Sequence, residues 1–546
     1  MARIAFCTFH NEMNTGLRCL LSYLAERGHR SRMVVLKLYS RKQIDEVPEP
    51  PLHTEVHEGL LPGGWQYLSY PTQPTEKEWA LWLEVVLEES PNVVCMSLAA
   101  SVFRIAADAT SRLRKARPSI VIIWGGTQPT VAPEMCLRHA EFVCIGEGES
   151  TVVALAEAID AGEPLHDLPN LAYISEDGNL VKNPVAPHVR DLDSLPFQDF
   201  QTETNFYIED EQVYQGEIPR QSTFHGSYMV YSTRGCPYTC SFCIHSVFSK
   251  IYEGLPRTRR RSVGNVIAEL KKIKERFGPL YICVEDDVFT LDRKWIHEFS
   301  EAYSKEVRLP FWCYTHPNCC DEQIIKDLKR AGIRAVIIGI QSGSAEVNKD
   351  IYNRATPRQR IAESLSILEK YDIPTYCDLL TNNPVETEEN RRETAFFLRE
   401  CSDSIVLTMG KLVFYPSTPI YEGVEDGENP PKVDDLLYQF WNSVYVHAVY
   451  AGLSESELED LIENEALRKD PTGLERKAIE YINEIHRKTD QRIMECDKRF
   501  EESYRRSSHS LPLSAQNPLV KSNGRWNTVL NKFKQRLPAY LVSTGS

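Results

Sequence analysis

The feature that most constrains the fold is an alternation of short apolar segments and amphipathic helices between residues 228 and 411. Six apolar segments occur, from YMVYSTRG at 228–235 to SIVLTMGKL at 404–412, and a segment with helical period separates each from the next. Because parallel strands need helical crossovers, repeated units of about thirty residues predict a parallel barrel. We therefore expect a partial (β/α)6 barrel of the TIM type, with its site on the loops that follow the strands.

A second alternation occupies residues 1–162 and is typical of a Rossmann-like α/β domain. Apolar strands such as ARIAFCTF at 2–9 and SIVIIWGG at 119–126 alternate with helices such as RIAADATSRLRKARP at 104–118. This order predicts a parallel sheet whose ligands lie beyond the carboxyl ends of its strands. Gly125-Gly126 and Gly146-Glu147-Gly148 follow two of these strands, and glycine there lets the backbone approach a ligand closely. An ordinary tight turn stays open as an alternative for each.

The remaining segments are less regular. Residues 163–225 carry hairpin signals, prolines and acidic patches without a sustained helical period, so we interpret them as a linker. From about residue 434 the pattern is helical again, whereas the end of the chain is polar and rich in Ser. We expect domains at 1–162 and 226–425, a C-terminal helical domain at 426–505 and a loosely ordered tail at 506–546.

The composition fits a protein of several globular domains. The 546 residues are 42% hydrophobic and 25% charged with a formal net charge of −15, which argues against a nucleic-acid-binding surface. No run approaches 18 apolar residues, and the opening MARIAFCTFH lacks the pattern of a secretory signal, so we expect a cytoplasmic protein without a membrane span. In a reducing compartment the 15 cysteines are more readily explained as metal ligands or small core residues than as disulfides.

Three cysteines stand out by their spacing. Cys236, Cys240 and Cys243 form a CxxxCxxC loop directly after the first predicted barrel strand. Thiolates are the ligands that iron-sulfur clusters prefer, and three of them on a four-iron cluster leave one iron open for chemistry. A structural zinc site, with His245 as the only close fourth ligand, is the alternative.

This loop and the βα units after it resemble the radical S-adenosylmethionine (SAM) superfamily. The resemblance implies that Cys236, Cys240 and Cys243 hold a 4Fe-4S cluster, whose open iron binds the amino and carboxylate groups of SAM. In that family an electron from the cluster then cleaves SAM to a 5'-deoxyadenosyl radical. The aromatic residue of the loop, Phe242, would pack near the adenine.

Two further barrel segments are similar to the subgroup with an N-terminal cobalamin domain. They are EDDVFT at 285–290 and GIQSGSAEV at 339–347, and the resemblance implies that Asp286, Asp287, Gln341 and Ser342 contact SAM. The subgroup normally has Glu where this chain has Gln341, which leaves the role of Gln341 open. A helix cap is the alternative for each single position. The segment TNNPVETEEN at 381–390 departs further from the Gly-Leu-Pro turn of relatives.

The first domain resembles the cobalamin-binding domain of the same subgroup. The resemblance implies a corrin pocket formed by Ser97, Leu98, Gly125, Gly126, Thr127, Gly146, Glu147 and Gly148. No Asp-x-His-x-x-Gly motif follows the first strand, so we expect no histidine ligand to cobalt and interpret His10 as a loop residue.

The resemblance implies a methyltransferase. Methylcobalamin would donate a methyl group, drawn from SAM, to an unactivated carbon or a phosphinate phosphorus of a small molecule in natural-product biosynthesis. Cyclisation or ring rearrangement without methylation remains open, and so does a non-enzymatic cobalamin carrier or sensor. Expected partners are a small-molecule substrate and an electron donor such as flavodoxin or ferredoxin.

Three local features are open to two readings. The basic run Arg257-Thr258-Arg259-Arg260-Arg261 could meet an anionic substrate, or could be a solvated loop before a helix. The aromatic residues of the first C-terminal helix are most simply core packing, and positions that face a substrate are the alternative. They are Tyr438, Phe440, Trp441, Tyr445 and Tyr450. The pair Cys319-Cys320 follows a barrel strand and could lie near the site.

Overall fold

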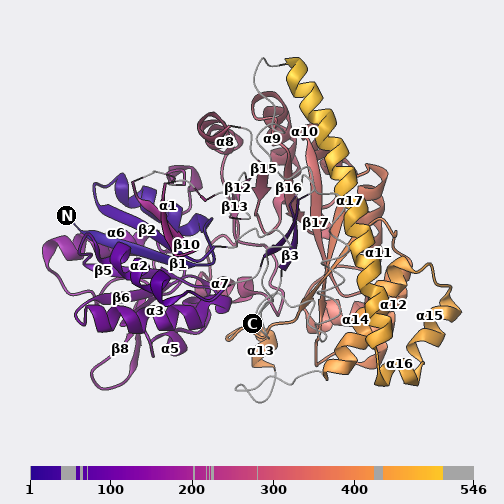
Figure 1. Cartoon of the computed structure of the whole chain (residues 1–546), viewed down its shortest axis with the longest axis horizontal. Helices are drawn as coiled ribbons and strands as arrows, with labels where there is room; N and C mark the ends of the chain where they lie inside the picture. Colours follow the sequence, from indigo (N-terminus) through magenta and orange to yellow (C-terminus); the bar gives the residue numbers. More distant parts are fainter. Residues whose placement is uncertain are drawn as a thin grey trace.

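The computed structural model describes residues 2–38, 57–61, 65–69, 72–198, 200, 203–216, 218–219, 222, 227–278, 281–423 and 434–507. In this part of the chain, a nine-stranded sheet and a six-stranded sheet lie side by side, and helices from the C-terminal part pack against the second (Figure 1). Two further sheets have two strands each. One pairs β3 (His57–Leu61) with β4 (Trp65–Ser69), and the other pairs β13 (Thr233–Arg234) with β14 (Arg259–Arg260).

The first sheet has the strand order β11-β10-β2-β1-β5-β6-β7-β8-β9. Its parallel centre consists of β2 (Arg30–Leu36), β1 (Arg3–Phe9), β5 (Val93–Ser97), β6 (Val121–Gly125) and β7 (Phe142–Cys144). Helices α1 (Thr15–Ala25) and α6 (Glu149–Ala161) pack on one face, while α2 (Glu76–Leu87) and α3 (Phe103–Ala116) pack on the other. The predicted Rossmann-like arrangement of residues 1–162 is confirmed.

The stretch 163–225, expected to be a linker, instead contributes four strands to this sheet. They are β8 (Leu171–Ile174), β9 (Leu180–Lys182), β10 (Asn205–Glu209) and β11 (Gln212–Gln215). Strand β10 lies parallel to β2, and its Glu209 accepts a hydrogen bond from Lys37 at 2.8 Å within the buried interior. The hairpin signals were visible in the sequence. The pairing of β10 with a strand some 170 residues earlier was not, because local pattern does not encode such a contact.

The second sheet confirms the predicted partial barrel. Its order is β12-β15-β16-β17-β18-β19, all parallel, with bounds Ser227–Val230, Tyr281–Val284, Phe311–Thr315, Ile333–Gln341, Thr375–Thr381 and Val406–Lys411. Helices α8 (Val263–Phe277), α9 (Arg293–Glu306), α10 (Glu322–Ala331), α11 (Arg358–Lys370) and α12 (Glu388–Arg399) form the crossovers. In β16 and β18 buried residues alternate with half-buried ones, so one strand face meets the helices and the other lines the lumen.

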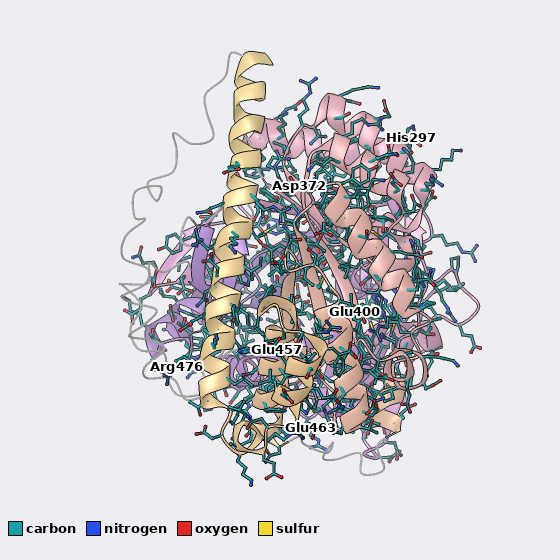
Figure 2. The ribbon with its side chains drawn as sticks, turned by 90° about the vertical axis from the view of Figure 1, so that its right-hand side faces the viewer. His297, Asp372, Glu400, Glu457, Glu463 and Arg476 are labelled. Carbon is teal, nitrogen blue, oxygen red and sulfur yellow. The ribbon has the colours of Figure 1, made fainter. Side chains whose placement is uncertain are left out.

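The C-terminal helices belong to the same core as the barrel. Helices α14 (Asp435–Tyr450), α15 (Glu455–Ile462), α16 (Glu465–Lys469) and α17 (Thr472–Ser507) follow in order, and α17 runs along the outside of the barrel (Figure 2). Phe440, Trp441 and Tyr445 are nearly or fully buried in one apolar cluster with the barrel strands. The expected core role of these rings is therefore observed, whereas most of the expected tail, from residue 508, lies outside the described residues.

None of the helices that the structure describes has both the length and the apolar character needed to cross a bilayer.

Replacing Phe440 by Ala tests whether α14 is part of the barrel core. Phe440 is fully buried, so its truncation should lower the free energy of unfolding of the whole barrel by about 3–5 kcal/mol in urea denaturation followed by circular dichroism. The control is Leu436→Ala on the same helix, where the side chain is 46% exposed and the expected change is within about 0.5 kcal/mol. Equal effects of the two substitutions would contradict this packing.

Candidate functional site

The three cysteines lie on a loop between strand β13 (Thr233–Arg234) and helix α7 (Ile244–Ile251). Strand β13 pairs with β14 (Arg259–Arg260), so the basic run itself supports the start of the loop. At Gly235 the backbone has φ +87°, and a Cβ atom would lie 2.0 Å from the backbone oxygen of Arg257. Only glycine therefore permits this entry into the loop.

The far side of the loop is fixed by the segment after β17. The Ser241 amide donates to the Tyr352 carbonyl at 2.9 Å, and its hydroxyl donates to the Ile351 carbonyl at 2.6 Å. The Asn353 side chain donates to the Thr239 carbonyl at 3.0 Å. Within the loop, the Cys243 amide donates to the Cys240 carbonyl at 3.0 Å. The cysteines are therefore presented on a defined turn.

The thiols themselves lie in a poorly solvated place. Cys240 is buried, whereas Cys236 and Cys243 are half-buried, and burial raises the pKa of each of these two to about 12. A bound metal reverses this preference, because it stabilises the thiolate directly. Within the described residues no three Cys, His, Asp or Glu side chains could share a single ion. A four-iron cluster does not require that, since each thiolate binds a different iron atom.

His245, the candidate fourth ligand for zinc, is used in another way. Its Nε2 lies 2.9 Å from a carboxylate oxygen of Asp287. This ion pair connects the end of the cysteine loop to the segment after β15. The donor set that remains is the three thiols, which fits the cluster interpretation better than the zinc alternative.

Phe242 points into a small apolar cluster. Its ring meets Tyr352 at a centroid distance of 5.0 Å in an edge-to-face arrangement, next to Val347, Leu412 and Ile420. Phe242 thus anchors the loop against the end of the barrel. The expected contact with adenine stays a prediction.

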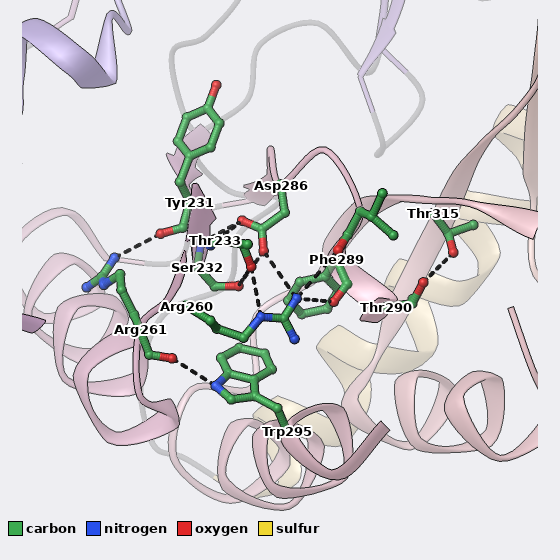
Figure 3. A network of polar contacts seen from close by, with 11 residues as sticks. Tyr231, Ser232, Thr233, Arg260, Arg261, Asp286, Phe289, Thr290, Trp295 and Thr315 are labelled. Carbon is green, nitrogen blue, oxygen red and sulfur yellow. Dashed lines mark hydrogen bonds and ion pairs between the residues drawn. The ribbon is translucent and has the colours of Figure 1, made fainter. Parts of the chain in front are cut away.

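Asp286 is fully buried, and its carboxylate accepts hydrogen bonds from neighbouring groups of the protein (Figure 3). One of its oxygens accepts from the amides of Ser232 at 2.6 Å and Thr233 at 3.1 Å, and the other accepts from the Ser232 hydroxyl. Arg260 lies 3.9 Å away, yet burial dominates and the pKa of Asp286 is raised. This placement favours a role in fixing the strand end below the cysteine loop, rather than the expected direct contact with SAM.

Gln341 and Ser342 end strand β17 in different environments. Gln341 is half-buried with φ +65°, and its side chain lies over Gly339, where a Cβ atom would meet it at 2.4 Å. Ser342 is buried, shares a hydrogen bond of 3.0 Å with Thr394, and accepts from the Ser344 amide. Ser342 therefore supports the turn, whereas the expected contact of Gln341 with SAM stays a prediction.

In the first sheet, close packing against Leu98 requires glycine at position 126 of the predicted turn. Gly126 has φ +98°, and a Cβ atom there would lie 2.7 Å from the Leu98 carbonyl. The Leu98 amide donates to Gly125 at 2.8 Å, and Leu98 itself is buried. Leu98 thus shapes the turn, while Ser97, Gly125, Gly126 and Thr127 present their exposed atoms to a cavity.

The second glycine turn contacts the barrel domain. At Gly146 a Cβ atom would lie 2.2 Å from the Tyr252 hydroxyl oxygen, which accepts a hydrogen bond from the Glu147 amide at 2.7 Å. The Glu147 carboxylate binds the Arg259 guanidinium and lies 3.4 Å from Arg234. Burial alone would raise the pKa of Glu147, but the arginines outweigh it and lower the pKa. Glu147, expected in the corrin pocket, thus also joins the two domains.

Most of the basic run is bound within the protein and is not the solvated loop of one expectation. Arg259 donates to Glu147 and to the Val189 carbonyl, while Arg260 donates to Thr233 at 2.8 Å and Phe289 at 2.8 Å. Arg261 donates to Glu269 and Asn265 at 2.6 Å each. Arg257 is exposed and stays beside the cysteine loop, with a hydrogen bond of 3.3 Å to Pro237. A strand pair therefore replaces the solvated loop.

One cavity of about 570 Å³ joins the two halves of the site. From the first domain it is lined by Ser97, Gly125, Gly126, Thr127, Gly146, Glu147 and Gly148. From the barrel it is lined by Cys236, His245, Asp287 and Tyr252, so the first cysteine of the loop faces the same space. His10 is buried elsewhere, and burial lowers its pKa to about 3. The structure thus brings the two predicted glycine turns, Cys236 and Asp287 to a single space between the domains. The other predicted cluster and SAM residues do not line it: Cys240, Phe242, Cys243, Asp286, Gln341 and Ser342.

The barrel lumen adds acidic groups that the sequence reasoning did not select. Glu285 follows β15 and lies in register between Tyr231 and Tyr314, and burial raises its pKa to about 7. Asp378 on β18 accepts a hydrogen bond from Thr408, and burial raises its pKa to about 6. The available signal was a carboxylate at the end of one predicted apolar strand, LYICVED, and within another, IPTYCDLLT.

Comparison with known families agrees with both halves of the site. Residues 230–398 match the Radical SAM superfamily, and residues 73–156 match the B12 binding domain. The chain therefore contains a B12-binding domain and a radical SAM domain. The cofactors of these two domains are a 4Fe-4S cluster with SAM, and cobalamin.

Curated relatives of this radical SAM protein are distant and of two kinds. It is 25% identical over 345 residues to an uncharacterized methyltransferase of Pyrococcus horikoshii, which covers 62% of this chain and 70% of that protein. It is 24% identical over 392 residues to the anaerobic magnesium-protoporphyrin IX monomethyl ester cyclase of Cereibacter sphaeroides, covering 70% of this chain and 60% of the cyclase. It is 26% identical over 310 residues to a cytidylyl-2-hydroxyethylphosphonate methyltransferase of Streptomyces wedmorensis, covering 51% of this chain and 55% of that enzyme. The chain thus spans less than two thirds of the length of the cyclase and of the phosphonate methyltransferase.

Solved structures share the fold. The radical SAM methyltransferase TsrM from Kitasatospora setae, solved with cobalamin and a 4Fe-4S cluster, matches with a TM-score of 0.55 at 18% identity, covering 78% of this chain and 74% of TsrM. The cobalamin-dependent radical SAM enzyme OxsB, solved with aqua-cobalamin, matches with a TM-score of 0.60 at 14% identity, covering 98% of this chain and 84% of OxsB.

Replacing Gly235 by Ala tests the entry into the cysteine loop. The added Cβ would meet the Arg257 backbone oxygen, so we expect the loop to shift and anaerobic reconstitution to yield severalfold less bound iron. Gly254→Ala is the matched control, since its φ of +79° gives the same backbone strain but nothing lies within 4 Å of the added Cβ. Equal iron content in the two variants would contradict the proposed constraint.

Replacing Glu285 by Gln tests its buried environment. Because the folded state raises its pKa from 4.5 to about 7, the protein should lose stability as pH rises through that window. In the metal-free protein, Glu285→Gln should remove this loss and raise the free energy of unfolding at pH 8 by about 2–3 kcal/mol, with little gain at pH 4.5. Urea denaturation at both pH values measures it, with the exposed Glu163→Gln as control. A gain that does not depend on pH would count against this assignment.

Proposed function

We propose that this protein is a cobalamin-dependent radical SAM methyltransferase. It transfers a methyl group from SAM, through methylcobalamin, to an unactivated carbon or phosphinate phosphorus of a small molecule in natural-product biosynthesis. The observation that carries the proposal is the shared cavity, which is lined by the glycine turns of the B12-binding domain and by Cys236. A carrier or sensor of cobalamin would have no need of a cysteine loop opening into the same space.

The cofactors supply the difficult chemistry when bound, namely a radical that can abstract an unreactive hydrogen atom and a methyl group that a substrate radical can accept. The protein supplies three thiolates on a turn fixed at both ends, so that one iron stays free of a protein ligand. Gly125 and Gly126 bring bare backbone to the edge of the cavity, which a flat ring system can approach closely.

Closure of the site is the other task of the chain. The contacts of Glu147 with Arg259 and Arg234, and of its amide with Tyr252, hold the two domains together beside the cysteine loop. Such a seal limits the access of water and oxygen to reactive species. A low-potential donor, a flavodoxin or a ferredoxin, is the proposed electron source.

The substrate would enter the lumen, whose polar groups are acidic. Glu285 and Asp378 lie there, while the arginines 259, 260 and 261 are bound within the protein. Only the exposed Arg257 of that run is placed at the cavity without an acidic partner among the described residues. These placements give less support to a strongly anionic substrate than the sequence did.

A cyclase that does not transfer methyl groups is the second candidate. Similarity to the anaerobic cyclase of Cereibacter sphaeroides, which covers 70% of this chain, favours it. The two candidates share both cofactors and differ in the fate of the methyl group. SAM labelled in its methyl group therefore separates them.

The test is an anaerobic incubation of the reconstituted protein with methyl-labelled SAM, hydroxocobalamin, a low-potential reductant such as reduced flavodoxin, and an extract of small molecules from the source organism, analysed by mass spectrometry. We expect a product that carries the label, and 5'-deoxyadenosine. Replacing Cys236, Cys240 and Cys243 together by Ala should abolish both, while Cys401→Ala, outside the loop, serves as control. Deoxyadenosine with an unlabelled, dehydrogenated product would favour the cyclase. Deoxyadenosine formation by the triple variant would contradict the cluster assignment.

A further inference from the structure

A buried arginine lies against the cysteine loop without a carboxylate partner. Arg354 is 7% exposed and follows the segment that holds the loop. One terminal nitrogen donates to the Gly339 carbonyl at 2.6 Å, and the other lies 3.8 Å from the sulfur of Cys240. Its Nε has no hydrogen-bond partner among the residues that the structure describes.

Such a cation is costly to bury unless an anion compensates it. Within the described residues no carboxylate forms an ion pair with Arg354, although Arg259, Arg260 and Arg261 all have acidic neighbours. A 4Fe-4S cluster held by three thiolates carries a net negative charge in both of its usual oxidation states. The position of Arg354 therefore fits a negatively charged neighbour at the loop.

His316 provides a second buried donor next to the loop. It follows strand β16, is 3% exposed, and stacks on the ring of Tyr238, a loop residue, at a centroid distance of 4.0 Å. The Asn318 amide donates to its Nδ1 at 3.1 Å, so Nδ1 carries the lone pair and the proton of the neutral ring is on Nε2. That Nε2–H group is buried and has no acceptor in the described part of the chain.

The two donors share one region. Arg354 is close enough to His316 to contribute, after burial, to the lowering of the His316 pKa. Tyr238 extends the region, because its hydroxyl lies 3.6 Å from the sulfur of Cys319. This contact also places Cys319 near the loop, whereas Cys320 is fully buried in the core.

We propose that Arg354 and His316 are positioning residues that donate hydrogen bonds to the sulfur atoms of the cluster and raise its reduction potential. Hydrogen bonds and positive charge beside cluster sulfur favour the reduced state, which carries one more negative charge. The inference rests on the cluster of the proposed function but not on methyl transfer. Neither residue was selected by the sequence motifs.

Two substitutions of His316 separate the donor from the turn that it supports. In His316→Asn the side-chain oxygen can replace Nδ1 as acceptor for Asn318, but the Nε2–H donor is lost. In His316→Gln the amide nitrogen can replace Nε2–H, but the Nδ1 acceptor is lost. A structural role and a cluster-facing role therefore predict opposite orders for the two variants.

The measurement is a redox titration of the reconstituted cluster by electron paramagnetic resonance without SAM, with iron content determined for each sample. His316→Asn should lower the reduced-to-oxidised ratio at a fixed potential by about tenfold, which corresponds to about 59 mV for one electron. His316→Gln should stay near the parent protein. Arg354→Met should lower the ratio by at least as much, and Arg354→Lys, which keeps the charge, by less.

Deuterium exchange gives a second readout that packing alone would not change. Pulsed resonance of the reduced cluster should show exchangeable protons coupled to it, and their signal should weaken in His316→Asn but not in His316→Gln. Unchanged potentials and couplings in iron-replete variants would overturn the proposal, as would a larger loss in His316→Gln. A shift that appears only with SAM would also overturn it, by assigning the donors to SAM.

Failure of the proposed function is distinguishable from these outcomes. If the parent protein assembles no cluster, the cluster assignment itself is wrong. If the parent assembles a cluster and the potentials shift as expected while no methylated product forms, the inference about Arg354 and His316 holds without the methyltransferase activity.

Discussion

The ion pair between Glu147 and Arg259 is the contact on which the rest of the site depends. It joins a glycine turn of the B12-binding domain to strand β14, and β14 pairs with the strand that leads into the cysteine loop. Arg234, two residues before Cys236, takes part through Glu147 and through Glu149 at 2.7 Å. Because burial disfavours an isolated charge, this group is stable only when both domains contribute to it. Domain packing and loop position are therefore one constraint.

Much of the architecture could be predicted from local pattern. The six βα units, the α/β first domain and the cysteine triplet are periodic or tightly spaced features, and the structure and the family matches confirm the fold and the two domain types. The strands of residues 171–215 escaped prediction as parts of the sheet. Their pairing depends on contacts with distant strands, and a short hairpin signal does not indicate which sheet it joins.

Residue roles were less predictable than residue positions. Asp286 and Ser342 lie in the predicted segments, yet their side chains are hydrogen-bonded to backbone amides and to neighbouring hydroxyl groups. A motif specifies where a polar side chain occurs, whereas its role depends on which unsatisfied groups surround it after folding. The basic run illustrates the same limit, since its arginines found partners on β13, on α8 and across the domain boundary.

The distribution of charge around the site follows from these placements. Beside the cysteine loop, Arg354 lies 3.8 Å from the sulfur of Cys240 without a carboxylate partner among the described residues, whereas Arg234 and Arg259 are paired with Glu149 and Glu147. Acidic groups lie deeper in the lumen, where burial keeps Glu285 and Asp378 partly protonated near neutral pH. A protonated carboxyl donates a hydrogen bond and carries no charge, so burial reduces the negative charge of these two groups near neutral pH and leaves the lumen polar.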